Sequence, residues 1–155
     1  MPFINVCNAI LQILEANDDV QLLYPVHPNP QVRGTAYALL NAHPRALLCE
    51  PLDYLPFVAA MKQSFLILSD SGGVQEEAPA LGKPVLVLRD ETERPEAVEE
   101  GVVKLVGTDR ETIVSNVQLL LDEPTVYRAM ARGVSPYGDG HASQRIATVL
   151  SQFRK

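Results

Sequence analysis

The chain of 155 residues has no tryptophan, two cysteines and three histidines. Two cysteines, Cys7 and Cys49, are too few for a disulfide scaffold, and no histidine lies at metal-ligand spacing from either of them. Basic residues are also scarce, because 13 lysines and arginines stand against 19 aspartates and glutamates, for a net charge of −6. An acidic protein of this kind is a poor partner for nucleic acids or anionic membranes, so we expect it to bind neither.

Long apolar runs are missing as well. No run approaches the roughly 20 apolar residues that a membrane span needs, and the N-terminus lacks the basic and apolar regions of a signal peptide. Internal repeats and low-complexity segments are absent too, and the hydrophobic content of 46% is typical of a folded protein. The sequence therefore predicts one domain, residues 1–155, in the reducing cytoplasm.

Short apolar runs alternate with segments of helical spacing along the chain. The runs predict strands at 20–26, 46–49, 65–68, 85–88 and 102–106. The helical spacing predicts helices at 3–17, 31–41, 54–62, 74–81, 96–100, 109–121, 124–132 and around 146–153. Asp53 is expected as the N-cap of helix 54–62, and either Thr108 or Asp109 as the N-cap of the helix that ends at 121. Gly82 is expected as the C-terminal cap of helix 74–81. The alternation predicts an α/β fold with a doubly wound parallel sheet.

The segment 65–95 contains the strongest candidate site. A polar turn, Ser69–Gly73, follows one predicted strand and precedes a helix that is expected to begin near Val74. The turn lies at the carboxyl end of the strand, where open α/β sheets bind their ligands. Paired glycines allow a ligand to approach the backbone, and free N–H groups at the start of a helix attract phosphate. The sequence therefore predicts an anion site at this turn.

Other phosphate-binding and catalytic motifs do not match. No Walker lysine follows the glycines, Gly72-Gly73 is not G-x-G-x-x-G, and Ser69 stands where a G-x-S-x-G motif around Ser71 requires glycine. These mismatches argue against a P-loop, a dinucleotide fingerprint and a hydrolase triad. We expect neither a metal nor a cofactor.

Five further residues allow two interpretations each. His27 follows the strand 20–26 and could face a ligand or simply bond to the turn backbone. Phe57 could pack in the core or stack on a base. Of the adjacent Glu76 and Glu77, one could point at the ligand and the other at solvent, since neighbours on a helix diverge by about 100°. Arg94 lies in a charged loop, and such loops are usually only solvated.

Five strings of residues, spread in order over nearly the whole chain, carry a resemblance to a known family. They are YPVHPNP (24–30), PLDYLPF (51–57), the long segment 69–97, LVGTD (105–109) and PYGDG (136–140). As a set they resemble the non-hydrolysing UDP-N-acetylglucosamine 2-epimerases. The resemblance covers only the second of two Rossmann-like domains, the C-terminal, UDP-binding half of a glycosyltransferase-B architecture. It implies an isomerase that interconverts UDP-N-acetylglucosamine and UDP-N-acetylmannosamine by elimination and re-addition of UDP.

The same resemblance implies roles for individual residues. It places Ser71, Gly72 and Gly73 on the diphosphate and Glu77 on the ribose hydroxyls. The other implied contacts are Phe57 and the backbone near Leu52 at the uracil, Arg94 beside the nucleotide, and His27 at a second, activating UDP-N-acetylglucosamine.

The resemblance also implies what the chain does not carry. In the family the acid and base carboxylates belong to the N-terminal half, so we expect no catalytic residue here and no epimerisation by this chain alone. A separate N-terminal-half polypeptide or a second copy of the chain is the expected partner, with the final helix (141–155) packing toward the missing domain. The alternatives are the donor-binding subunit of a two-chain UDP-sugar glycosyltransferase and a non-catalytic UDP-sugar sensor.

Overall fold

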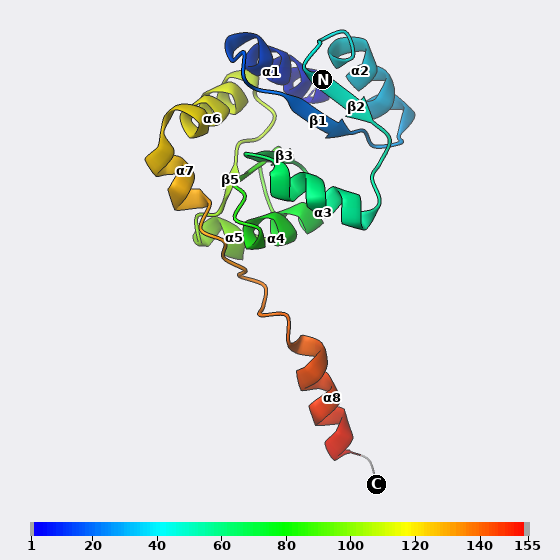
Figure 1. Cartoon of the computed structure of the whole chain (residues 1–155), viewed down its shortest axis with the longest axis vertical. Helices are drawn as coiled ribbons and strands as arrows, with labels where there is room; N and C mark the ends of the chain where they lie inside the picture. Colours follow the sequence, from blue (N-terminus) through cyan, green and yellow to red (C-terminus); the bar gives the residue numbers. More distant parts are fainter. Residues whose placement is uncertain (1, 154–155) are drawn as a thin grey trace.

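The computed structural model describes residues 2–153 and has an α/β body followed by one helix that stands apart from it (Figure 1). The helices are α1 (Pro2–Ala16), α2 (Pro30–Leu40), α3 (Tyr54–Gln63), α4 (Gly72–Ala80), α5 (Pro95–Glu99), α6 (Arg110–Asp122), α7 (Pro124–Met130) and α8 (Ala142–Gln152). The strands are β1 (Leu22–Pro25), β2 (Ala46–Cys49), β3 (Ile67–Ser69), β4 (Val85–Val87) and β5 (Val103–Leu105). Every expected element is present, and the α/β class is confirmed. The bounds lie within two residues of those predicted except at α8, which begins four residues before the predicted start at 146.

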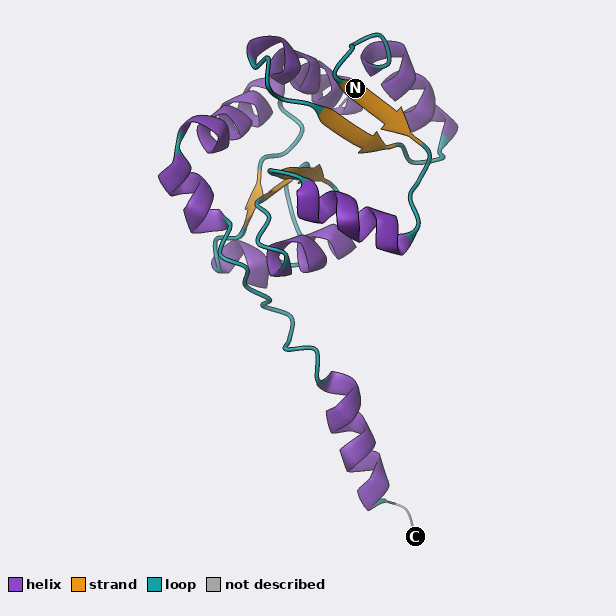
Figure 2. Ribbon diagram, in the orientation of Figure 1, coloured by secondary structure: helices purple, strands orange, loops and turns teal. Residues whose placement is uncertain are grey.

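Every strand pairs in parallel with its neighbour, but the ladder hydrogen bonds form two separate groups (Figure 2). β1 pairs with β2, with Leu22 opposite Ala46, and β4 lies between β3 and β5. The expectation of one continuous ladder was therefore too simple. Side chains join the two groups instead, because residues of β1, β2, β3 and β4 share one hydrophobic cluster.

Strand β4 separates the two hydrophobic clusters of the body. Successive side chains of a strand point to opposite faces, and all three residues of β4 are buried. Leu86 belongs to the cluster formed with α1 and α6, whereas Val85 and Val87 belong to the cluster beneath α4 and α5. The body is thus layered, with helices on both faces of the β3–β5 sheet (Figure 1).

Helix α4 begins two residues earlier than expected, so Gly72 and Gly73 form its first turn. Pro79 lies one residue before the end of α4, where it interrupts little of the hydrogen-bond pattern. Gly82 follows with φ at +69°, and Lys83 N–H donates to the Ala78 carbonyl. The expected glycine cap is confirmed, and it holds α4 at a defined length ahead of β4.

The last helix, α8, lies away from the body, and none of its residues is buried (Figure 1). Its apolar side chains Ile146, Val149, Leu150 and Phe153 recur at the spacing of one helical face and are 52–77% exposed. Nothing in residues 2–153 covers this face. No helix within residues 2–153 is both long enough and apolar enough to cross a membrane.

Candidate functional site

The N-terminus of α4 has no side-chain cap. Ser71 occupies the N-cap position with extended backbone angles, but its hydroxyl does not bond back to the helix. Its own N–H donates to Ser69 Oγ at 3.1 Å, which shapes the turn. The first N–H groups of a helix have no partner within it, and the helix dipole is positive at this end. The exposed hydroxyl and these N–H groups together form a donor set suited to an anion.

Gly72 and Gly73 are not required by the backbone, because neither has a positive φ. They are not required by packing either. A Cβ at Gly72 would meet nothing within 4 Å, and one at Gly73 would meet only Ser71 Oγ, at 3.9 Å. What the two glycines do is leave the space above the first turn of α4 open, so that a ligand can reach the backbone.

The charged loop, residues 89–95, folds back onto α4. Arg94 Nε donates to Glu76 Oε1 in an ion pair whose side chains are 35% and 38% exposed. The hydrogen bond to Glu76 and its charge raise the pKa of Arg94 above its usual value. The guanidinium also donates from NH1 to the Glu93 carbonyl at 3.1 Å, and its other donors are left for a ligand. Arg94 is therefore anchored on the helix whose first turn carries the donor set of Ser71–Gly73.

The two glutamates of α4 diverge, as their spacing predicts. Glu76 is half-buried and engages Arg94, whereas Glu77 is exposed. A carboxylate on the exposed face can accept two hydroxyl donors, the geometry that a ribose presents. The sequence did not predict that Glu76 pairs with Arg94.

Phe57 and Leu52 are both half-buried, Phe57 in the first turn of α3 and Leu52 just ahead of that helix. Phe57 packs against the cluster beneath α4. The core interpretation of this residue is therefore confirmed, and stacking on a base stays a prediction. No hydrogen bond or ion pair within residues 2–153 joins either residue to Ser71–Gly73.

His27 is exposed at the end of β1, and its Nδ1 accepts a hydrogen bond from Asn29 N–H at 3.2 Å. This contact agrees with the interpretation in which His27 bonds to the backbone of the turn. Asn29 in turn caps α2 by accepting from Gln31 N–H. The side chain of His27 keeps its Nε2 free of the turn, so the same histidine can still meet a ligand through that atom.

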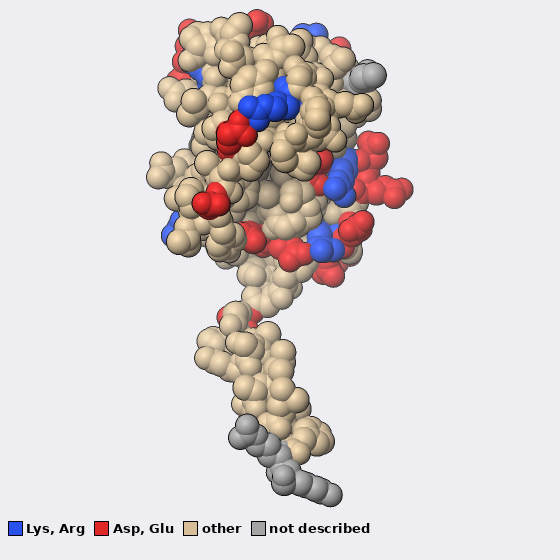
Figure 3. Space-filling view, turned by 90° about the vertical axis from the view of Figure 1, so that its right-hand side faces the viewer, with Lys and Arg blue, Asp and Glu red and all other residues tan. Residues whose placement is uncertain are grey.

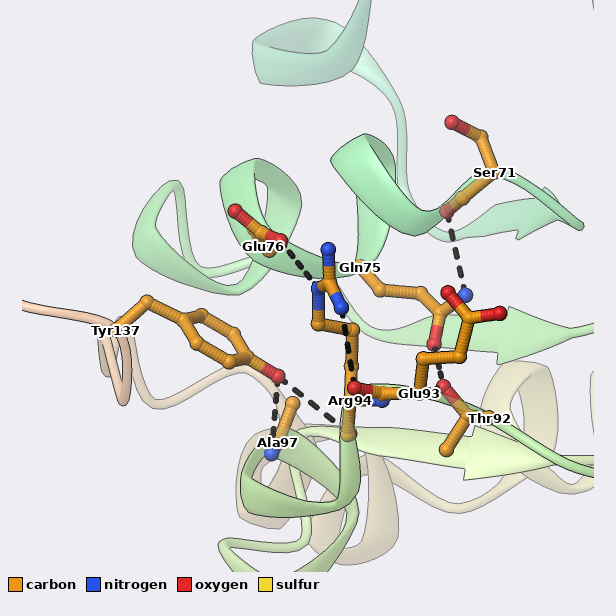
Figure 4. Close-up of polar contacts among 8 residues, drawn as sticks. All are labelled: Ser71, Gln75, Glu76, Thr92, Glu93, Arg94, Ala97 and Tyr137. Carbon is orange, nitrogen blue, oxygen red and sulfur yellow. Dashed lines mark hydrogen bonds and ion pairs between the residues drawn. The ribbon is translucent and has the colours of Figure 1, made fainter.

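Three further polar residues gather at the site that the sequence did not single out: Gln75, Thr92 and Tyr137 (Figure 4). Thr92 Oγ1 donates to Gln75 Oε1 at 2.6 Å, and Tyr137 contacts the backbone of Arg94 and Ala97. Burial raises the pKa of Tyr137, which keeps its hydroxyl protonated. The sequence offered one signal for this cluster, because Gln75 is a polar residue between Val74 and Ala78 on the inner face of a helix.

Two cavities of the body border the charged loop and α5, and Thr92 lines the first of them. One, of about 470 Å³, is lined by Asp90, Glu91 and Glu99, whose charges disfavour an anion. The other, of about 450 Å³, lies beneath α5. Figure 3 views the side toward which β1 and β2 point and shows a recess between the upper and lower parts of the body, with acidic and basic side chains on its rim. The donor set of α4 is thus an open surface.

Comparison with known proteins supplies the family. Residues 1–151 match the family model described as UDP-N-acetylglucosamine 2-epimerase. UDP-N-acetylglucosamine 2-epimerase of Escherichia coli (strain K12) is 51% identical over 152 residues, which cover 98% of this chain and 40% of that protein.

Solved structures agree with this match. The S. aureus MnaA–UDP co-structure aligns with a TM-score of 0.94 at 43% identity, covering 98% of this chain and 42% of that one. UDP-GlcNAc 2-epimerase from Neisseria meningitidis, bound to UDP-GlcNAc, aligns with a TM-score of 0.93 at 47% identity, covering 97% and 40%. The chain spans about 40% of the length of the relatives it matches. The fold, the exposed donor set at the start of α4 and these similarities lead to one conclusion: the chain belongs to the UDP-N-acetylglucosamine 2-epimerase family.

Proposed function

We propose that this chain is the UDP-sugar-binding part of an epimerase that interconverts UDP-N-acetylglucosamine and UDP-N-acetylmannosamine by eliminating and re-adding UDP. The observation that carries the proposal is the uncapped start of α4 at Ser71–Gly73, with Arg94 anchored on the same helix. Elimination requires the departing diphosphate to be stabilised, and preorganised N–H donors and a guanidinium perform that electrostatic work. The bound UDP and UDP-GlcNAc of the solved relatives support this assignment.

Each site residue then has a role. Ser71 and the first-turn N–H groups bind the diphosphate, Arg94 neutralises its charge, and the exposed Glu77 accepts from the ribose hydroxyls. The exposed part of Phe57, with the backbone near Leu52, lines the uracil pocket. His27 binds a second, activating UDP-GlcNAc through the ring edge that does not contact Asn29.

The chemical step needs a group that moves the proton at C2 of the sugar. We assign that group to the part of the full-length relatives that this chain does not cover. The chain alone is therefore expected to bind UDP and not to epimerise. Sustained conversion of UDP-GlcNAc by the purified 155-residue chain would contradict this assignment.

The substitution Glu77→Ala tests the binding site. Loss of a hydrogen bond to a charged group costs about 1.5–3 kcal/mol, so the dissociation constant for UDP is expected to rise about 10- to 150-fold. Calorimetric titration of the chain with UDP measures this. Glu15→Ala, which makes the same charge change at an exposed position of α1, should bind as the unmodified chain does. Absence of binding by the unmodified chain at millimolar UDP would overturn the proposed function.

The exposed apolar face of α8 leads to a second expectation. We propose that it packs against a separate polypeptide that supplies the part of the relatives' length this chain does not cover, or against a second copy of this chain. Leu150→Asp should abolish association with a polypeptide spanning that part, measured by sedimentation, whereas Ser151→Asp, on the opposite side of α8, should not. Deleting residues 141–155 should leave the unfolding temperature of the body unchanged, because α8 has no buried residue. A lower unfolding temperature would show instead that α8 packs on the body.

A further inference from the structure

Gln75 is the only polar side chain of residues 2–153 that is fully buried, at 1% exposure. It lies on α4 next to Val74, within the cluster beneath that helix. Burying an amide is costly unless its polar atoms are bonded, and here both ends of the amide are. Nε2 donates to the Ser71 carbonyl at 3.3 Å, and Oε1 accepts from Thr92 Oγ1 at 2.6 Å. The amide therefore connects the anion-binding end of α4 with the charged loop.

The direction of the next bond follows from the chemistry of a hydroxyl. Thr92 has a single O–H hydrogen, which it donates to Gln75, so toward any other group it acts as an acceptor. It accepts the N–H of Arg94 at 3.0 Å. A continuous series of hydrogen bonds thus runs from the Ser71 carbonyl through Gln75 and Thr92 to the backbone of Arg94 (Figure 4).

Arg94 is held from two other directions. Its carbonyl accepts from the Tyr137 hydroxyl at 3.4 Å, and that hydroxyl accepts from Ala97 N–H at 3.3 Å. Its guanidinium is oriented by Glu76. Both backbone groups and the side chain of Arg94 are therefore engaged before any ligand is present.

We propose that Gln75 is a positioning residue for UDP binding, which acts through Thr92 to hold Arg94 beside the N-terminus of α4. The inference rests on the proposed function, because Arg94 needs a fixed position only if it meets a diphosphate. Gln75 is buried and does not touch the ligand. Its effect is on preorganisation, since ordering a mobile loop on binding would cost conformational entropy that a held loop does not lose.

Thr92 provides the sharpest test, because it is half-exposed and its hydroxyl can be removed without a change of shape. Thr92→Val removes the hydroxyl, and Thr92→Ser keeps it. Calorimetry with UDP should show about tenfold weaker binding for Thr92→Val, the worth of one or two neutral hydrogen bonds. Thr92→Ser should bind within about twofold of the unmodified chain, because it restores both bonds. A chain in which Thr92→Val binds UDP as tightly as the original overturns the proposal.

A double-mutant cycle separates positioning from general destabilisation. If Thr92 acts through Arg94, then Thr92→Val should have no further effect on UDP affinity in an Arg94→Ala background. Gln75→Met, which keeps the length of the side chain and removes its bonds, should weaken binding as much as Thr92→Val does, and the two together no more. A full tenfold loss for Thr92→Val in the absence of the Arg94 side chain contradicts the inference.

Hydrogen exchange of the Arg94 amide gives a readout that does not depend on UDP. The amide should exchange about tenfold faster in Thr92→Val than in Thr92→Ser, because only the serine variant keeps the acceptor. If the unmodified chain does not bind UDP, the proposed function fails. The exchange comparison then tests by itself whether the hydrogen bonds through Thr92 hold the backbone of Arg94. Faster exchange in Thr92→Val supports it, and equal exchange in the two variants overturns it.

Discussion

Replacing Gly72 with alanine is expected to remove most of the affinity of the chain for UDP while its stability stays the same or rises. A Cβ at this position meets nothing within 4 Å and the backbone has no positive φ, so the fold accepts alanine. Glycine to alanine at a compatible position stabilises a protein by about 0.4–1 kcal/mol. The new methyl group, however, would fill the space through which a phosphate reaches the first turn of α4.

The expected loss of affinity is about 10- to 150-fold, the worth of one charged hydrogen bond that can no longer form. Calorimetry with UDP and thermal unfolding measure the two effects on the same sample. Gly34→Ala is the matched control, because Gly34 lies in α2 with equally open space around its Cβ position. It should raise stability and leave UDP binding unchanged. Equal UDP affinity in both variants would show that the ligand does not approach Gly72.

Leu86→Ala is expected to have the largest effect on folding. Leu86 is 1% exposed in the central strand of the three-stranded group and packs in the cluster formed with α1 and α6. Deleting a buried leucine side chain costs about 2–5 kcal/mol, a large part of the roughly 5–15 kcal/mol by which domains are stable. Urea denaturation, with circular dichroism as the probe, measures the change in the free energy of unfolding.

Leu150→Ala is the control for that measurement. Leu150 is 64% exposed on α8, so the same truncation should change the free energy of unfolding by less than about 0.5 kcal/mol. Similar losses for the two variants would mean that α8 packs on the body in solution, contrary to the arrangement in Figure 1.

Local features of the chain were well determined by the sequence, because they depend on neighbouring residues. The buried strand β4, the helix ends at Gly82 and Asp109, and the polar turn at Ser69–Gly73 that leads into α4 all follow from periodicity and capping chemistry within a few residues. Asp109 accepts from Thr112 N–H as its capping pattern predicts. Asp53 shows the limit of such rules, since it occupies the N-cap of α3 but makes no capping bond.

The assembly of the site was decided only by the tertiary structure. Arg94 meets Glu76, and Thr92 meets Gln75, across 17 or 18 residues that include a strand and two loops. Composition marks these residues as polar and charged, but their partners depend on where β3 and β4 place the segments that follow them. The parallel alignment of these two strands puts α4 and the charged loop at the same edge of the sheet. Spacing along the sequence does not encode that proximity, because hydrogen bonds act over about 3 Å in space, wherever the chain has brought its donors and acceptors together.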